Sequence, residues 1–285
     1  MIAAERGGDE VRKARENPLN VVVKGKTREG VLDVLTQADS NSNLIMVNTL
    51  SFTFPGMKII SEENLSGGTD FVKPITFEQT ILDDLKYANI PDDILLPIKD
   101  LTVWIDPLDA TKEYSEGLTD YVTTMVCVAS NGKPILGVIH RPFFQQTFWS
   151  TKFGIDKKLL KLRNVYMKKN ETIRFIVSRS HKGDVVKRVQ QSFHNKFTVI
   201  DAAGSGYKTL ELFHGKADIY LHTTHIKKWD ICAPHAFIKY ASEGDLQTLN
   251  GHTIQYGEDA SSLNPDGVFA SLNPDLIKYR KMFEK

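Results

Sequence analysis

The chain has 285 residues, a formal net charge of +1 and a hydrophobic content of 41%. A chain of this size can bury a large core, either as one broad unit or as two lobes that share a cleft. Its nearly neutral charge argues against a nucleic-acid polymer as the main partner, because proteins that bind one usually carry a marked basic excess. No run of 18 apolar residues occurs and no cleavable signal follows Met1, so we expect no membrane span within this sequence.

The N-terminal part of the sequence has helical patterns and one short strand. Charged residues flanked by glycine, at 9–17, indicate a solvated helix or arm. Residues 31–54 have the apolar spacing of a helix, and we expect the polar residues 40–43 to interrupt it as a loop. A short strand is expected at 57–61.

Strands dominate the middle of the sequence. Residues 64–100 are rich in Pro, Gly and Asp, and we expect an insertion there with one short helix at 77–88. The strongest hairpin pattern then joins 122–129 to 134–140 around an Asn-Gly pair. Residues 145–151 can add a third antiparallel strand.

From residue 172 onward, strand and helix patterns alternate, which favours a second sheet with helices packed on it. The strand candidates are 173–178, 197–201 and 217–222, and the helix candidates are 183–193, 205–214, 229–241 and 274–283. The pattern therefore predicts two lobes joined near residue 160.

The two cysteines lie in different kinds of segment, Cys127 in an apolar strand and Cys232 in a predicted helix. Two cysteines do not support a disulfide framework, so we expect two buried thiols. The cysteines therefore do not indicate whether the protein works in an oxidising or a reducing compartment.

Two carboxylates stand three residues apart in the segment Trp104-Ile105-Asp106-Pro107-Leu108-Asp109-Ala110-Thr111. The apolar run before them predicts a buried strand, and Pro107 cannot continue a ladder, so we expect the chain to turn there. Two acids this close repel each other unless a proton or a cation lies between them, and hard divalent cations prefer such oxygen ligands. The segment predicts a metal site, with a solvated Asp-Pro turn as the competing interpretation.

Further acids occupy comparable positions elsewhere in the chain. Glu62 and Glu63 follow the strand expected at 57–61, and Asp230 precedes the helical stretch that ends at Ala241. Ligands of layered α/β sheets gather at strand ends and helix starts. We therefore expect four separate carboxylates to converge.

In this order, the Glu-Glu pair, the Asp-Pro-Leu-Asp-Ala-Thr segment and the Trp-Asp-Ile-Cys-Ala segment resemble the three signature motifs of the inositol monophosphatase superfamily. The resemblance extends from about Lys24 to the C-terminus. It implies an α+β fold, the layered α-β-α-β-α sandwich that this superfamily shares with fructose-1,6-bisphosphatase. It also implies a magnesium-dependent, lithium-sensitive phosphomonoesterase in which residues 1–160 and 161–285 are two lobes of one catalytic domain.

Three further segments resemble the branch of the superfamily that hydrolyses 3′-phosphoadenosine 5′-phosphate, namely Thr111-Lys112-Glu113-Tyr114, Ser178-Arg179-Ser180-His181 and Lys227-Lys228-Trp229-Asp230. Ala110 stands where most members carry glycine, which resembles the Golgi-resident members of that branch. The resemblance implies a small nucleotide substrate and a location in the Golgi lumen, with a membrane anchor upstream of this sequence. A cytoplasmic location is the alternative, and a homodimer is left open.

The resemblance also assigns roles around two or three Mg²⁺ ions. The implied metal ligands are Glu62, Asp106, the Leu108 carbonyl, Asp109 and Asp230. Glu63 would orient water, and Thr111 would relay the proton of that water to Asp39. We choose Asp39 over Asp33, and the competing interpretation of Asp39 is a helix N-cap.

The substrate contacts implied by the same resemblance lie in both lobes. Backbone N–H groups of Ala110 and Thr111 would bind the phosphate. The residues expected on the nucleotide side are His181, Ser205, Gly206, Lys208 and Lys228, with Lys227 and Lys228 equally readable as a solvated pair. The remaining histidines, His222 and His235 among them, show no zinc-ligand spacing with the cysteines and are expected at the surface or satisfied in the interior.

Two alternatives remain open. One is an inositol phosphate phosphatase with the same metal site, and the other is a catalytically silent member of the fold. Asn64 and Asn170 begin glycosylation sequons. Asn64 lies so close to the expected metal ligands that we expect it to stay unmodified.

Overall fold

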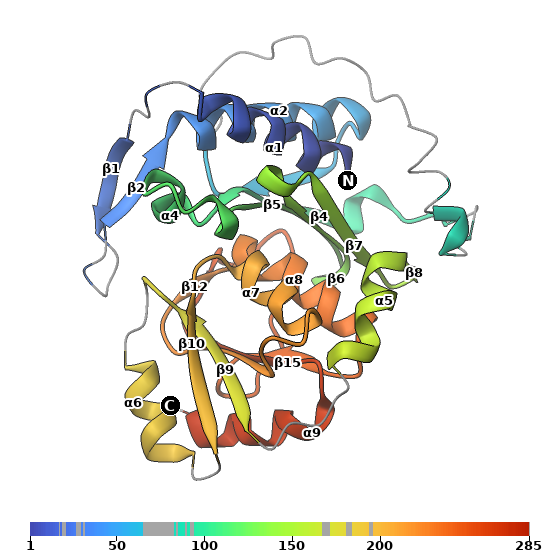
Figure 1. Cartoon of the computed structure of the whole chain (residues 1–285). Helices are drawn as coiled ribbons and strands as arrows, with labels where there is room; N and C mark the ends of the chain where they lie inside the picture. Colours follow the sequence, from blue (N-terminus) through green and yellow to red (C-terminus); the bar gives the residue numbers. More distant parts are fainter. Residues whose placement is uncertain are drawn as a thin grey trace.

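A computed structural model describes the chain except for residues 17, 19–20, 27–29, 31, 65–82, 84, 89, 92–93, 167–171, 181–183, 194–195 and 285, and the side chains of 32–33 and 163–166. The described elements form five layers in the order α-β-α-β-α (Figure 1). This arrangement is the layered α+β sandwich expected from the sequence. Within the described part of the chain, no helix is long and apolar enough to cross a membrane.

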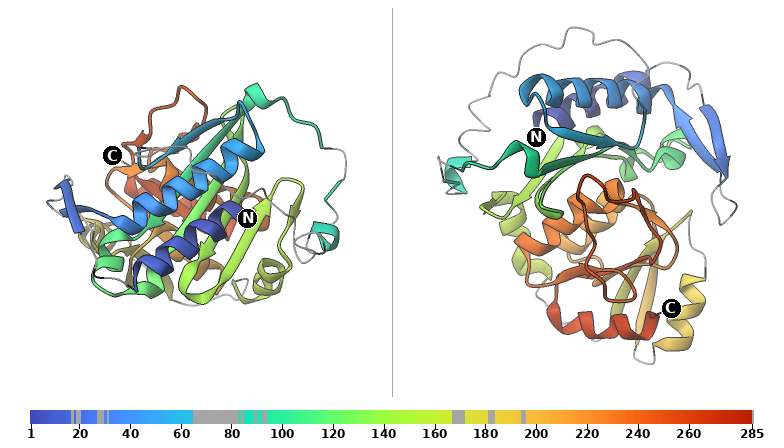
Figure 2. Two further views of the ribbon diagram at one scale, coloured as in Figure 1. Left: turned by 90° about the horizontal axis from the view of Figure 1, so that it is seen from above. Right: turned by 180° about the vertical axis from the view of Figure 1, so that it is seen from behind.

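The first two layers are a helix pair and a six-stranded sheet. Helices α1 (Ile2–Ala14) and α2 (Gln37–Thr53) lie side by side over the sheet (Figure 2, left). The strand order is β3 (Lys58–Ser61), β4 (Leu101–Asp109), β5 (Thr123–Ser130), β6 (Lys133–Arg141), β7 (Gln146–Thr151) and β8 (Gly154–Ile155). β3 is parallel to β4, and the other neighbours are antiparallel.

The alternation of side chains along β4 explains why this sheet is covered on both faces. Val103 and Ile105 pack in the core under α1 and α2, whereas Trp104 packs in the core on the opposite face. On that face lie the helices of the middle layer, α5 (Lys157–Tyr166), α7 (Ser205–Phe213) and α8 (Lys228–Ala241). α8 approaches β6 so closely that a Cβ at Gly137 would lie 2.7 Å from the carbonyl oxygen of Ala233.

The second sheet and the last helical layer complete the fold. The strand order is β10 (Phe197–Ala202), β9 (Ile173–Ser178), β11 (Ile219–His222), β15 (Val268–Ser271) and β13 (Asp245–Gln247). β10, β9 and β11 are parallel, whereas β15 is antiparallel to both of its neighbours. Phe175 and Val177 of β9 face the outer elements α6 (Val185–Ser192), α9 (Pro274–Ile277) and η4 (Lys278–Phe283), and Ile176 faces the middle layer.

Smaller elements connect the layers and line the cleft. β1 (Val21–Lys26) and β2 (Leu32–Thr36) form an antiparallel ribbon outside both large sheets (Figure 1). β12 (Ile226–Lys227) pairs with β14 (Leu263–Asn264), and α4 (Thr111–Ser115) follows β4 directly. The remaining short helical turns are η1 (Ile98–Asp100), η2 (Thr119–Tyr121) and η3 (Pro142–Phe144).

Several predicted elements are confirmed. The hairpin joins β5 to β6 through Asn131 and Gly132, both with positive φ, as a tight two-residue turn requires. β7 is the expected third strand, and β9 has the predicted bounds. Most of the expected helix at 77–88 lies outside the described residues.

Four local predictions are wrong. The helix expected over 31–54 begins only at Gln37, and residues 32–36 form strand β2 instead. Residues 40–43 do not form a loop but belong to α2, where Ser42 and Asn43 are buried because they hydrogen-bond to the backbone of Pro107 and Glu63. The chain does not leave the sheet at Pro107, since β4 continues to Asp109 through an irregularity in its pairing with β5. The solvated helix expected at 9–17 is the end of α1, which begins at Ile2 and buries one face against the sheet.

The prediction of two buried thiols is also wrong. Cys127 of β5 and Cys232 of α8 form a disulfide with a Cα–Cα distance of 5.7 Å. Both residues lie in the core between the six-stranded sheet and the middle helices. Their separation of 105 residues hid the pairing from the sequence, because spacing alone cannot show which segments pack together. The bond connects the two lobes predicted from the sequence.

Candidate active site

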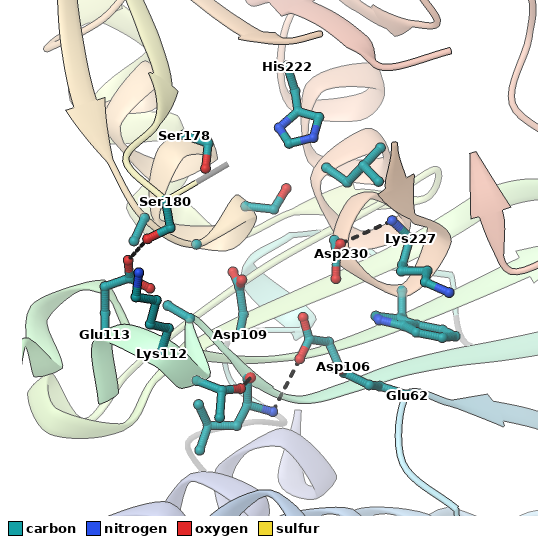
Figure 3. Close-up of a pocket in the computed structure, with 18 of the residues that line it drawn as sticks. Glu62, Asp106, Asp109, Lys112, Glu113, Ser178, Ser180, His222, Lys227 and Asp230 are labelled. Carbon is teal, nitrogen blue, oxygen red and sulfur yellow. Dashed lines mark hydrogen bonds between the residues drawn. The ribbon is translucent and has the colours of Figure 1, made fainter. Parts of the chain in front are cut away.

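A cleft of about 550 Å³ is lined by residues from both sheets. Its centre is acidic, with Glu62, Asp106, Asp109 and Asp230 among the lining residues. Asp106, Asp109 and Asp230 point into one common space (Figure 3). The structure therefore brings together the four carboxylates that the sequence singles out.

An irregularity in β4 presents Asp106 and Asp109 to the cleft. Asp106 pairs with Met125 and Asp109 with Thr123, so the two residues between them have no partner on β5. Pro107 occupies this gap, where its missing N–H group costs no ladder bond. Asp106 Oδ1 accepts a hydrogen bond of 3.2 Å from Leu108 N, while its buried Oδ2 has no hydrogen-bond partner among the described residues.

Asp109 and Asp230 each accept a hydrogen bond from a backbone N–H group. Asp109 Oδ2 accepts hydrogen bonds from Gly206 N at 2.8 Å and from Thr123 Oγ1 at 3.2 Å. Gly204 lets α7 come this close, because it has a φ of 67° and a Cβ there would lie 3.0 Å from Asp109 Oδ2. Asp230 Oδ2 accepts a hydrogen bond of 3.2 Å from Lys227 N at the start of α8.

Burial and mutual repulsion raise the pKa of each acid in this cluster. Burial raises the pKa of Asp230 to about 7, with the nearby Asp109 carboxylate adding to the shift. Burial raises the pKa of Asp106 and of Glu62 well above the usual range, and neighbouring carboxylates raise it further. The pKa of Asp109 also rises on burial, and the Lys208 ammonium opposes this shift.

The donor set fits a hard divalent cation. The cluster offers only oxygen donors, one of them without a hydrogen-bond partner, and its carboxylates raise each other's pKa. In the geometry described, no three acidic, His or Cys side chains are yet close enough to enclose one ion. The side chains would therefore have to move closer together to enclose a metal ion.

Asp39 and Thr111 meet at the edge of the cluster although they are 72 residues apart. Thr111 Oγ1 donates to Asp39 Oδ1 at 2.8 Å and also lies 3.0 Å from the Leu108 carbonyl oxygen. The other oxygen of Asp39 accepts bonds from the backbone N–H and the hydroxyl of Thr36, which caps α2. Asp39 thus serves as a helix-capping residue and as a partner of Thr111. Its burial raises its pKa to about 6.

Glu62 and Glu63 share a basic neighbour. The Lys24 ammonium of β1 forms an ion pair with Glu63 and lies 3.8 Å from Glu62 Oε1. A lysine therefore sits at these two carboxylates, and it reaches them from the ribbon of β1 and β2.

The expected substrate residues are distributed unevenly. Ala110, Thr111, Ser205 and Lys208 line the cleft, whereas the Gly206 N–H is occupied by Asp109. Lys228 is buried and is not one of the lining residues, although its neighbours Lys227 and Trp229 are. His181 lies outside the described residues. Lys208 is 4% exposed, with its ammonium 5.1 Å from the centre of the Tyr220 ring.

Comparison with known proteins identifies the family. The model of the inositol monophosphatase family matches residues 1–275. Inositol monophosphatase 3 of Xenopus tropicalis is 45% identical over 298 residues, which cover 99% of this chain and 79% of that protein. The Golgi-resident adenosine 3′,5′-bisphosphate 3′-phosphatase of Mus musculus is 48% identical over 281 residues, covering 95% of this chain and 76% of that protein.

The chain belongs to the inositol monophosphatase family. The extragenic suppressor protein suhB from Bartonella henselae has the same fold, with a TM-score of 0.68 at 18% identity over 100% of this chain and 96% of that one. Membership makes the chain a phosphoric monoester hydrolase.

Three lining residues of this family member were missed by sequence reasoning. His222 ends β11 and points toward the cleft, and His225 and Lys24 also line it (Figure 3). The position of His222 at the end of a parallel strand is the signal that could have found it. His235, the other histidine considered, is buried in the core and contacts the Tyr256 hydroxyl at 3.1 Å.

Proposed function

We propose that the chain hydrolyses the 3′-phosphate of 3′-phosphoadenosine 5′-phosphate to give AMP and phosphate, with Mg²⁺ as cofactor. The observation that carries the chemistry is the hydrogen bond from Thr111 to Asp39 beside the four clustered carboxylates. The substrate follows from the mouse relative, whose name specifies adenosine 3′,5′-bisphosphate.

Five groups of this chain would hold two or three Mg²⁺ ions, and they are Glu62, Asp106, the Leu108 carbonyl, Asp109 and Asp230. When bound, the ions supply positive charge that offsets the phosphate and favours ionisation of water. We expect lithium to inhibit the enzyme, as the family resemblance implies.

Thr111 and Asp39 provide a path for the proton that water releases on attacking phosphorus. Thr111 Oγ1 can accept this proton while it donates its own to Asp39 Oδ1, along the existing bond of 2.8 Å. The raised pKa of Asp39, about 6, suits a group that takes up a proton near neutral pH. Glu63 would orient the water, and the N–H groups of Ala110 and Thr111 would face the phosphate. The bond from phosphorus to the ribose 3′-oxygen breaks, the leaving oxygen takes a proton from solvent water, and Asp39 returns its proton to solvent after the product has left.

The second lobe supplies the groups for the rest of the nucleotide. Lys208 and Lys227 bring positive charge to the cleft, which suits the 5′-phosphate that is not cleaved. Ser205 and His222 add polar atoms on the same side, and the ring of Trp229 offers a flat surface for adenine.

Turnover by the purified protein tests this assignment. We expect a higher kcat/KM for 3′-phosphoadenosine 5′-phosphate than for inositol 1-phosphate, with both reactions dependent on Mg²⁺. A strong preference for the inositol substrate would replace the proposal with the second candidate, an inositol phosphate phosphatase. The relative named inositol monophosphatase 3 favours that candidate.

The sequence also left open a catalytically silent member of the fold, and Asp109→Asn tests whether the acidic cluster carries the hydrolase activity. Asp109 is held by Gly206 and Thr123 at the centre of the cluster. The variant should lose hydrolysis if the cluster is active. Unchanged turnover of the variant would mean that the observed activity comes from elsewhere.

We also propose that the protein works in the Golgi lumen. The relative from mouse is named Golgi-resident, and the disulfide between Cys127 and Cys232 suits an oxidising compartment rather than the cytoplasm. Mass spectrometry of protein from its native cells checks this, because a cytoplasmic enzyme would carry both thiols reduced.

A further inference from the structure

Two of the segments that resemble the nucleotide-hydrolysing branch contact each other across the cleft. Glu113 lies on α4, which follows β4 of the six-stranded sheet. Arg179 and Ser180 follow β9 of the five-stranded sheet. Glu113 and Ser180 both line the cleft, and the reaction proposed above uses none of the three residues.

The contact is made by hydrogen bonds to one carboxylate oxygen. Ser180 Oγ donates to Glu113 Oε1 at 2.5 Å, and Arg179 Nη1 donates to the same oxygen at 3.2 Å (Figure 3 shows the serine bond). Among the described residues, these two from the opposite lobe are the hydrogen-bond donors to this carboxylate. Arg179 N also donates to the carbonyl oxygen of Ala202 at 2.8 Å, which fixes the arginine backbone to β10.

Burial makes Glu113 depend on these partners. Glu113 is 3% exposed, so water cannot replace a lost partner easily. The neighbouring Glu116 differs in this respect. It contacts Arg179 at 2.8 Å, but both side chains are more than a third exposed, and such surface ion pairs contribute little.

The contact lies between two parts of the cleft that are proposed to bind different parts of the substrate. Glu113 is two residues from Thr111 on the same short helix. The start of this helix carries the N–H groups proposed above to face the phosphate, and we call it the phosphate side. Ser180 lies two residues after Ser178, the last residue of β9. It is on the side where Ser205 and Lys208 line the cleft, which we call the nucleotide side. A shift at the contact would therefore change the distance between the phosphate side and the nucleotide side.

We propose that Glu113, Arg179 and Ser180 form an interlobe latch. The latch fixes the distance between the nucleotide side and the phosphate side of the cleft. The latch favours substrates that contact both sides of the cleft over small phosphate monoesters, which contact the phosphate side alone. This inference rests on the proposed nucleotide substrate. The three latch residues are positioning residues, because they act through the placement of other groups.

Binding of two ligands of different size tests the latch in the presence of Mg²⁺. We expect Glu113→Gln and Ser180→Ala each to weaken AMP binding by about tenfold, the scale of one hydrogen bond to a charged group. Both variants should bind inorganic phosphate within about twofold of the wild type, because phosphate does not reach the nucleotide side and the Gly206–Asp109 hydrogen bond that joins the two lobes at the acidic cluster stays in place. Glu116→Gln is the matched control, and it should change neither affinity by more than about twofold.

Steady-state kinetics of the single variants and of the double variant complete the test. The latch variants should raise KM for 3′-phosphoadenosine 5′-phosphate more than they lower kcat, and the double variant should cost no more than the worse single one. Two results would contradict the latch and leave the proposed function standing. In the first, the latch variants bind AMP as well as the wild type does. In the second, they lose AMP binding and phosphate binding to the same extent. If the wild type neither binds AMP nor hydrolyses the bisphosphate, the proposed function fails first. Ser180→Ala removes a single hydroxyl, so it decides the question even if Glu113→Gln does not fold.

Discussion

The hydroxyl of Thr111 and the carboxylate of Asp39 share a 2.8 Å hydrogen bond at the margin of the acidic cluster. Asp39 is 1% exposed, and its second oxygen caps the helix on which it lies. One buried side chain thus caps the start of α2 and accepts the hydrogen bond of Thr111. This double role makes the geometry of the pair rigid.

Replacing Asp39 should impair hydrolysis far more than folding. Asp39→Asn keeps the size and one acceptor oxygen but removes the proton acceptor, so kcat should fall by roughly 10²- to 10⁴-fold. Steady-state kinetics with the nucleotide measure this loss. Asp33→Asn is the control, since Asp33 is the alternative that the sequence offers. Equal activity of Asp39→Asn and wild type would remove Asp39 from the mechanism.

The stability of the metal-free protein should fall as the pH rises. The pKa values of Asp39 and Asp230 rise on folding to about 6 and about 7, so these groups favour the folded state only while protonated. Their contribution is complete below about pH 4 and is lost as the pH passes through about 6 to 7. Mg²⁺ offers another countercharge, so its stabilising effect should increase over the same range. Melting curves with Mg²⁺ or a chelator at several pH values would show this, and indifference to the chelator would contradict it.

Removing Lys24 should tighten Mg²⁺ binding. Its ammonium lies against Glu63 and 3.8 Å from Glu62, where it competes with a cation for the same carboxylates. Lys24→Ala should lower the Kd for Mg²⁺ by up to about fivefold, the scale of a partly exposed ion pair. Calorimetric titration measures the change. Lys26→Ala removes an exposed lysine from the same strand and should have little effect, so an equal response of both variants would point to net charge alone.

Ala110→Gly should stabilise the protein. Ala110 has φ 71° and ψ 43°, a left-handed conformation that glycine adopts without the steric cost borne by alanine. We expect a gain of up to about 1 kcal/mol in the free energy of unfolding, measured by urea denaturation. Ala236→Gly in the middle of α8 is the opposite case and should lose about 1 kcal/mol. A loss of stability in both variants would show that the backbone at Ala110 is not strained.

Removing the disulfide should weaken the joint between the lobes. The bond closes a loop of about a hundred residues, and replacing both Cys127 and Cys232 by alanine should cost about 2–4 kcal/mol. Thermal melting of the double variant, and of the wild type with and without reductant, measures the cost. Reductant should lower the melting temperature of the wild type alone. Free thiols in the unreduced, denatured wild type would show that the bond does not form.

Local patterns predicted the parts of the fold that depend on neighbours in sequence. The bounds of β9 and the Asn131-Gly132 turn follow from alternation and from turn chemistry. Ser42 and Asn43 were misassigned because their polarity suggests solvent, whereas their partners lie on segments distant in sequence. The continuation of β4 past Pro107 was missed for a similar reason, since an irregularity in the strand removes the need for its N–H group.

The sequence predicted those residues of the candidate site that belong to a recognisable motif. The acids at 62, 106, 109 and 230 come from three ordered segments, and the structure places them in one cleft. Lys24, His222 and the contact between Glu113 and Ser180 were not foreseen, because each depends on how separate segments meet. The disulfide was missed on the same ground.

The hydrogen bond from Gly206 to Asp109 has a consequence for how the enzyme can be divided. A carboxylate of the first lobe owes its orientation to a backbone group of the second, and Asp230 comes from that second lobe as well. A polypeptide cut near residue 160 would leave neither fragment with the complete acidic cluster. Activity should then return only when both pieces are refolded together, so complementation between fragments would report directly on the closure of the cleft.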